Sequence, residues 1–350
     1  MKLHKRRSEW AFLTPIHNLF LTEEVDEEIR IDRVTFISSA KLLRVRDRLG
    51  VNKKHLREAK SRMGKSQIRR FEQIFEEDST FAVLRHTGKP ANIRDDCYRI
   101  VQDELAVLVF SQLLFKNRKN TGFVGLAGEH DRSTATNIFL DSRTSSQITG
   151  WNTLRSPTSF TLDDTWFSFH RRLFFFELLS LLQGKVRISP NWRRSIRRAV
   201  ILVGKGLNSR DVGDAFLWTM IALELLLTQK GDSYPADMVK RAASLLDWSA
   251  YWGTDSLSEG IENLYRLRCE YVHDGNADRI DAENLDLADK LVFNILWNLV
   301  DHSFVFGSKE ALINFAKRHE ARNLLGLSSP KKPNLHYANK RTQVLNYREV

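Results

Sequence analysis

The sequence predicts a mainly α-helical protein, in which an α+β N-terminal region is followed by an all-α helical bundle. Up to about residue 165, segments that alternate apolar and polar residues stand among segments of helical spacing. From residue 166 onward, apolar residues recur almost only at the three- and four-residue intervals of an amphipathic helix. We therefore expect domains at 1–165 and 166–325, followed by a basic tail at 326–350 that forms either a mobile extension or a strap.

The first region is expected to mix strands and helices. Alternating patterns predict strands at 28–37 and 81–88. Helical spacing predicts helices at 39–49, 66–77 and 94–115. Short segments bounded by Gly, Ser, Thr and Asp predict further strands or extended loops at 123–128, 135–142 and 146–153.

The second region is expected to be helical throughout. Its periodic segments are 166–184, 190–207, 211–229, 235–248, 257–274, 281–304 and 308–320. Ser189-Pro190 is a typical helix start, and Gly184 and Gly275 stand where helices are expected to end.

Composition limits the classes of function. The chain has 54 Lys and Arg against 43 Asp and Glu, a formal charge of +11, which favours polyanionic partners such as nucleic acid. Its two cysteines, Cys97 and Cys269, lack the spacing of a disulfide framework or a zinc site, so we expect a reducing, cytoplasmic protein without metal or cofactor. The longest apolar run, 173–182, is about half the roughly 20 residues that a bilayer requires, so no membrane segment is expected.

Two basic segments are candidate RNA contacts. The segment 51–70 contains one acidic residue, Glu58, and the segment 191–200 carries arginines on one side of a predicted helix. The alternative is that each is an ordinary solvated helix face. The candidate RNA-binding residues are Lys53, Lys54, Arg57, Lys60, Arg193, Arg194 and Arg197.

The segment NLYRLRCEYVHDGN, residues 263–276, carries the candidate catalytic pair, Arg268 and His273. Histidine titrates near neutral pH, and the planar guanidinium of arginine matches a phosphate group. A similar spacing joins Arg48 to His55, so spacing alone does not identify a site. On an ideal helix two residues five apart point to different sides. If the last turn unwinds at Asp274 and Gly275, we expect His273 to swing toward Arg268 or toward its dimer mate.

The context of Arg268 resembles the Apea-like branch of the HEPN superfamily. Three blocks carry the resemblance in order: RSIRRAVILVGKGLNSRDVGDAFLWTMIALELLL, DMVKRAASLLDW and IENLYRLRCEYVHDG. The resemblance covers about residues 190–305. The sequence departs from that family at Cys269, where its ribonucleases often have a small polar residue, and at Asp274, where they commonly have glycine.

The resemblance implies a homodimeric helical bundle in which two Arg/His motifs meet across the interface and cleave RNA without a metal. His273 would then act as general base or general acid, and Arg268 would hold the phosphate. Supporting roles are expected for Glu224, Arg241, Asp274 and Gly275, with Glu224 pairing with either Arg241 or Arg268. Asp274 beside His273 would either help it act as an acid or repel phosphate and mark an inactive copy. Such an endoribonuclease would serve as a toxin or an anti-phage defence effector, with an antitoxin or regulatory protein as a further partner.

Two other interpretations stay open. In the first, the bundle is a non-catalytic HEPN module for RNA binding or dimerisation, and Arg268 and His273 maintain the fold. In the second, the chain is a DNA-binding regulator, which the basic segments favour although no helix-turn-helix pattern accompanies them.

Overall fold

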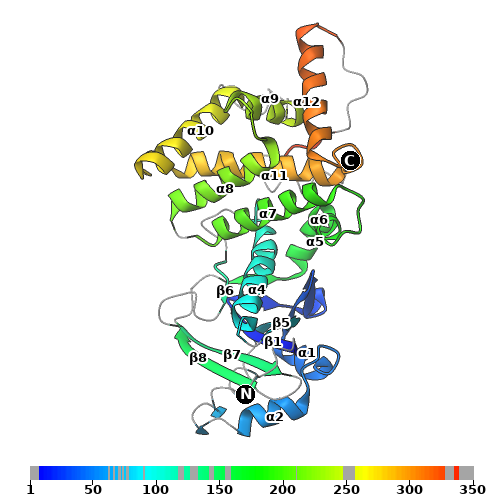
Figure 1. The fold of residues 1–350 in the computed structure, drawn as a ribbon, viewed down its shortest axis with the longest axis vertical. Coiled ribbons are helices and arrows are strands. Elements are labelled where there is room, and N and C mark those ends of the chain that lie inside the picture. The colour runs from blue at the N-terminus through cyan, green and yellow to red at the C-terminus, as the bar shows by residue number, and fades with distance from the viewer. Residues whose placement is uncertain are drawn as a thin grey trace, which may run out of the picture. The chain divides into compact units, whose positions relative to one another are not determined.

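The computed structural model describes residues 8–61, 64–65, 68–69, 72, 75, 79–89, 91–116, 122–126, 133–141, 146–153, 159–209, 211–246, 257–327 and 335–338. Within these ranges the fold is mainly α-helical, and strands gather in the N-terminal part of the chain, as predicted (Figure 1). The chain divides into two compact units. A sheet unit comprises Met1–Leu108 and Asn120–Ser168, and a helical unit comprises Val109–Lys119 and Phe169–Val350.

An antiparallel sheet forms the centre of the sheet unit. The strands, in spatial order, are β3 (Glu28–Ile31), β4 (Val34–Ser38), β5 (Thr80–Gly88), β1 (Ser8–His17), β7 (Ser133–Asp141) and β8 (Ser146–Thr153). Strand β6 (Gly125–Leu126) pairs with the end of β1, and β2 (Leu19–Leu21) pairs in parallel with β9 (Phe160–Leu162). The remaining elements are the 3-10 turn η1 (Glu23–Val25) and the helices α1 (Ser39–Val45), α2 (Lys53–Ser61) and α4 (Ile93–Phe110).

Strand β1 is central to the sheet, yet the sequence pattern did not predict it. It pairs with β5 on one side and with β7 on the other, and residues 10–16 are all buried. A strand buried on both faces lacks the alternation by which strands are predicted. Pro15 lies beyond the β7 ladder, which ends at Leu13, and stands opposite Phe81 of β5.

Two segments that were each predicted as one element are two elements, and the helices predicted at 39–49 and 94–115 end earlier, at Val45 and Phe110. The strand expected at 28–37 is a hairpin of β3 and β4, with Asp32 in a left-handed conformation (φ 48°) at the turn. The helix expected at 166–184 is interrupted at residues 173–174. It forms two helices, α5 (Asp164–Arg172) and α6 (Phe175–Leu182). The helix expected at 66–77 lies largely outside the described residues.

The other helices of the helical unit confirm the predicted spans closely. They are α7 (Pro190–Leu207), α8 (Val212–Leu227), α9 (Ala236–Leu246), α10 (Leu257–Asp274), α11 (Ala282–Asp301) and α12 (Lys309–Leu324). The predicted start at Ser189 is confirmed, since its side chain accepts a hydrogen bond from the amide of Trp192 at 3.2 Å. The Trp192 indole in turn donates to the Phe306 carbonyl at 2.9 Å and ties α7 to the segment before α12.

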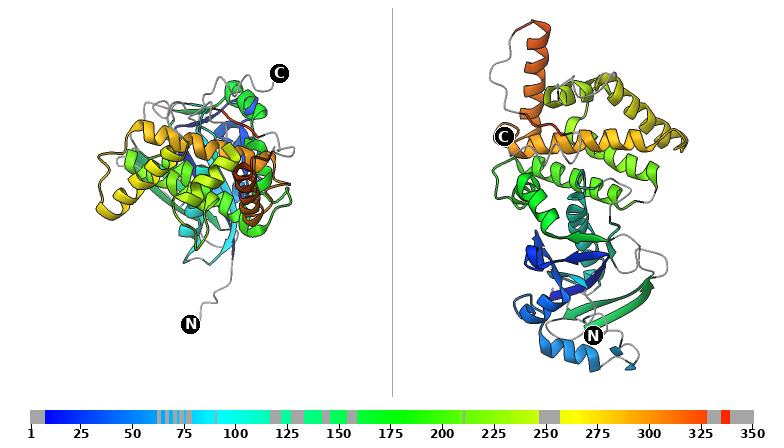
Figure 2. Two further views of the ribbon diagram at one scale, coloured as in Figure 1. Left: turned by 90° about the horizontal axis from the view of Figure 1, so that it is seen from above. Right: turned by 180° about the vertical axis from the view of Figure 1, so that it is seen from behind.

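Helix α11 lies at the centre of this unit. Every residue from Leu291 to Val300 is buried. The helix contacts α6 and α8 on one side and α9 and α10 on the other, an arrangement visible from two directions (Figures 1 and 2). In the part of the chain that the structure describes, no helix has the length and apolarity needed to cross a membrane.

Candidate active site

Helix α10 carries the Arg/His pair and remains helical through both residues. Its apolar side buries Ile261, Leu264 and Leu267. The helix ends at Asp274, and Gly275 follows in the left-handed conformation (φ 67°), which glycine adopts without steric cost. The predicted helix end is therefore confirmed, but the last turn is not unwound.

Arg268 forms an ion pair with Glu224 of α8. The Arg268 Nε atom lies 2.9 Å from Glu224 Oε1, and Nη2 donates to Oε2 at 3.3 Å. The Nε–H bond is not directed at Oε1, so the first contact is a charge interaction without a hydrogen bond. Of the two partners expected for Glu224, the structure selects Arg268. Among the described residues none accepts a hydrogen bond from Nη1, so that end of the guanidinium is available to an anion.

The environment of this pair is partly dehydrated. The side chains of Arg268 and Glu224 are 23% and 18% exposed. Burial raises the pKa of Glu224 above its ordinary value, although the charge and hydrogen bond of Arg268 act in the opposite direction. The ion pair thus offsets part of the cost of burying the carboxylate and fixes the direction of the arginine side chain.

Two tyrosines border the ion pair, and the sequence pattern did not identify them. Tyr265, one turn before Arg268, is hydrogen-bonded to Cys269, and burial is the main reason that its pKa is raised. Its ring stacks on that of Tyr234, with centroids 5.7 Å apart. The Tyr234 hydroxyl donates to Thr228 Oγ1 at 2.7 Å, and Thr228 marks the end of α8. The available signal was the position of Tyr265 three residues before Arg268, on the same side of α10.

His273 lies on another side of α10, in its exposed last turn. A separation of five residues rotates a side chain by roughly 140° around the helix axis. The His273 imidazole and the Arg268 guanidinium of one chain therefore point to different sides. Within the described ranges, neither a hydrogen bond nor an ion pair holds His273, and Asp274 beside it is also exposed. A single copy of the chain does not bring the imidazole to the guanidinium.

Arg241 does not support this site. Its guanidinium donates to Asp232 Oδ1 at 2.8 Å and to the carbonyl of Leu227 at 2.6 Å, and a further bond joins it to Asp232 Oδ2. Both side chains of the Arg241–Asp232 pair are 5% exposed. The pair closes the turn between α8 and α9, so the expected alternative pairing of Arg241 with Glu224 was wrong.

The candidate RNA-binding residues of α2 are mostly exposed. Lys53, Lys54 and Arg57 are open to solvent, while Lys60 pairs with Glu72. Lys54 lies 3.9 Å from Glu58 on the same helix, a distance at which a solvated ion pair contributes little. The segment therefore keeps free positive charge at Lys53 and Arg57.

The arginines of α7 differ from one another. Arg193 is partly buried, and its Nη2 donates to the Val186 carbonyl at 3.1 Å, so it fastens the connection from α6. Arg194 is exposed and donates to Asn191 Oδ1 at 2.6 Å, and Arg197 is half-buried. Helices α2 and α7 belong to different compact units, so each is a candidate surface of its own unit.

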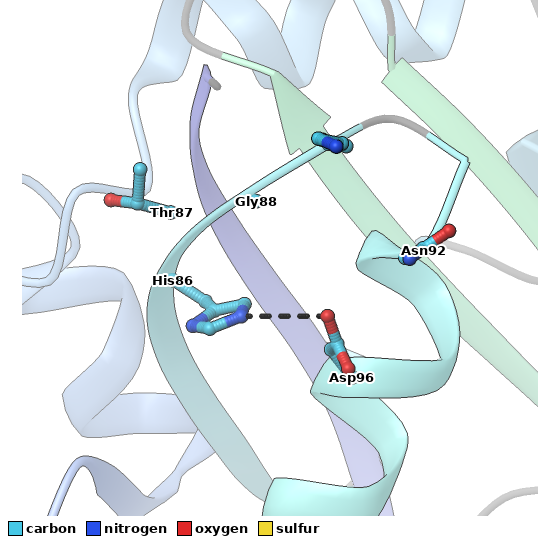
Figure 3. A pocket seen from close by; sticks show the side chains of 6 residues that line it. His86, Thr87, Gly88, Asn92 and Asp96 are labelled. Carbon is cyan, nitrogen blue, oxygen red and sulfur yellow. Dashed lines mark ion pairs between the residues drawn. The ribbon is translucent and has the colours of Figure 1, made fainter. Parts of the chain in front are cut away.

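A surface pocket in the sheet unit was not predicted. It has a volume of about 410 Å³ and is lined by His86, Thr87, Gly88, Lys89, Asn92 and Asp96. Figure 3 shows the imidazole of His86 facing the carboxylate of Asp96, with Nε2 4.0 Å from Oδ2. Burial lowers the pKa of His86, the charges of Arg33 and Arg99 add to that effect, and Asp96 opposes it. The pocket has a polar rim but no paired nucleophile and base.

Comparisons with known proteins identify no relative. No protein-family model, curated protein or solved structure matches the chain. In the described residues, no group of three or more His, Cys, Asp and Glu side chains could hold a metal ion. The chemistry of the candidate site must therefore be argued from Arg268, His273 and their neighbours.

Proposed function

We propose that the protein is a metal-independent endoribonuclease of HEPN type, in which Arg268 and His273 from two copies of the chain act on one phosphodiester. The observation that carries the proposal is the Glu224–Arg268 pair. Glu224 occupies the Nε and Nη2 edge of the guanidinium and leaves Nη1 available. An exposed histidine stands at the end of the same helix, where a second copy can reach it.

The reaction is an internal transesterification. One imidazole, as general base, takes the proton of the ribose 2′-hydroxyl, and the 2′-oxygen attacks the adjacent phosphorus. The bond from phosphorus to the 5′-oxygen breaks, and the same imidazole, now protonated, gives its proton to that oxygen as general acid. Arg268 stabilises the negative charge that develops on the phosphoryl oxygens. The products are a 2′,3′-cyclic phosphate and a 5′-hydroxyl, and no water or metal enters the step.

The test compares matched variants on mixed RNA in EDTA. His273→Ala should lower cleavage by about 10²-fold or more, the usual contribution of a general acid or base. Arg268→Ala should do the same, whereas Arg266→Ala removes an exposed guanidinium from the same helix and should leave cleavage unchanged. Size-exclusion chromatography must give one elution volume for all four proteins. Equal cleavage by wild type and His273→Ala would contradict the proposal.

Mixing the two inactive variants tests whether the site is shared between copies. A heterodimer of Arg268→Ala with His273→Ala retains one intact site in which Arg268 and His273 come from different chains. Random pairing makes half of the dimers mixed, so the mixture should recover about a quarter of wild-type activity. No recovery would contradict an intermolecular site.

A second candidate function is a non-catalytic helical module. The observation in its favour is that a single chain ties Arg268 to Glu224 and separates it from His273. On this hypothesis wild type cleaves no RNA, Arg268→Ala destabilises the fold because Glu224 loses its partner, and His273→Ala changes neither stability nor assembly.

A further inference from the structure

An extended segment of the tail, residues 335–338, lies on α11 and is bound through its backbone. The Asn298 side chain donates to the His336 carbonyl at 2.9 Å and accepts from the His336 amide at 2.7 Å. Asn294 makes the same pair of bonds with Ala338, at 2.9 and 2.7 Å. Each asparagine side chain is thus hydrogen-bonded to both the backbone amide and the backbone carbonyl of one tail residue.

The two asparagines are held in position for this task. Both are fully buried, at 0% exposure. The second amide hydrogen of Asn294 goes to the Lys290 carbonyl at 2.8 Å, and that of Asn298 goes to the Asn294 carbonyl at 2.9 Å. Because each amide group has two donor hydrogens, both are used and each carboxamide is fixed in one orientation.

The spacing of the asparagines matches an extended peptide. Two residues four apart on a helix are separated by about 6 Å along its axis, and alternate residues of an extended chain by about 6.6 Å. Asn298 and Asn294 therefore meet His336 and Ala338 in register. Hydrogen bonds to backbone carbonyl and amide groups do not depend on the side chain of the bound residue. Proline at the position of His336 or Ala338 is the exception, because it has no amide hydrogen to donate.

One side chain of the segment is also recognised. The His336 ring stacks on Trp297, with centroids 4.7 Å apart, and on His302 at 5.4 Å. Its Nε2 atom pairs with Asp301. Ala338 is 1% exposed, so only a small side chain fits at its position. We call Asn294, Trp297, Asn298, Asp301 and His302 the α11 groove.

We propose that the α11 groove is a peptide-binding site for an extended His-X-Ala segment, filled here by the chain's own tail and able to exchange it for the tail of a second copy. The chain's own tail and the tail of a second copy can form the same contacts with the groove, because they have the same sequence. Seven residues, 328–334, separate this segment from Leu327, and seven residues span at most about 25 Å. The proposal is independent of the Arg/His site.

Ala338→Pro in the full chain is the first variant, because it removes the amide that donates to Asn294 and leaves the groove intact. The probe is a fluorescent peptide with the sequence of residues 333–340, PNLHYANK, measured by anisotropy. In wild type the attached tail competes at an effective concentration on the order of millimolar. The Ala338→Pro chain should therefore bind the probe at least tenfold more tightly than wild type.

Two controls decide what the binding means. Asn298→Leu added to Ala338→Pro should abolish probe binding, and a scrambled peptide should not bind. Full chains carrying Ala338→Pro alone and Asn298→Leu alone should associate when mixed, because one retains the groove and the other retains the tail. Failure of the Ala338→Pro chain to bind the probe, binding that survives Asn298→Leu, or no association of the mixed chains would overturn the proposal. Unfolding of Ala338→Pro would overturn it too, since the segment would then be part of the core.

Discussion

His170 should make the helical unit lose stability as the pH falls. The side chain is 3% exposed and packs among Phe115, Phe169 and Phe175, with ring centroids between 5.1 and 5.8 Å away. Burial lowers the pKa of His170 from 6.5 to about 3, and the nearby backbone of Ser111 opposes this only in part. The folded protein therefore holds a neutral imidazole at pH values where the unfolded chain binds a proton.

The sign and size of the effect follow from this difference. The folded pKa lies below the unfolded value, so acidification favours the unfolded chain. The contribution is complete above pH 6.5 and is lost progressively as the pH falls toward 3. Each pH unit in that window costs about 1.4 kcal/mol, so between pH 7 and pH 5 the free energy of unfolding should fall by about 2 kcal/mol because of His170.

The assay is urea unfolding followed by far-UV circular dichroism at pH 7 and pH 5. His170→Phe and His170→Gln remove the titrating group, one with an apolar ring and one with a polar side chain. Both should be about 2 kcal/mol less sensitive than wild type to the change of pH, whatever their stability at pH 7. Phe169→Leu disturbs the same packing but keeps the imidazole, so it should retain most of the pH dependence. Equal pH dependence in wild type and both His170 variants would refute the reasoning.

Three further predictions concern single side chains. Arg241→Met removes the charge partner of Asp232, whose carboxylate keeps the Gln229 amide as a hydrogen-bond donor, and should lower the free energy of unfolding in urea by about 3 kcal/mol. Trp192→Phe leaves the Phe306 carbonyl without its donor and should cost about 1–3 kcal/mol in the same assay. If the proposed ribonuclease is correct, Glu224→Gln should weaken the hold on Arg268 and lower kcat about tenfold with little change in KM; a change in KM alone would contradict a positioning role.

The helices of the second unit were predictable because helical hydrogen bonds and the spacing of an apolar stripe are local in sequence. Segments such as 190–207 and 257–274 carry an apolar stripe together with a start or stop signal, and the structure places their ends at those residues. Strand β1 was not predictable by this method, since a strand buried on both faces has no alternation to detect. The break at residues 173–174 was hidden for a different reason, because it falls at the start of the apolar run 173–182 and neither glycine nor proline marks it.

The candidate site was predictable in its residues but not in their geometry. The sequence identified Arg268, Glu224 and His273, and it left two partners open for Glu224. Only the packing of α10 against α8 decides that question, because the pair joins residues 44 positions apart. The docking of residues 335–338 was equally out of reach, since Asn294 and Asn298 look like ordinary polar residues until an extended segment lies beside them.

The Glu224–Arg268 pair also bears on how the protein would attract RNA. The carboxylate balances the charge of the guanidinium, so Arg268 can orient a phosphate through Nη1 but adds little long-range attraction. On the same helix Glu270 pairs with both Arg266 and Arg279, which balances much of the remaining positive charge there. The attraction of RNA that is expected from a net charge of +11 must then come from other basic residues. Exposed residues such as Lys53 and Arg57 can supply it. If the proposed ribonuclease is correct, binding and chemistry depend on different residues, and His273→Ala should lower cleavage without lowering the affinity for RNA.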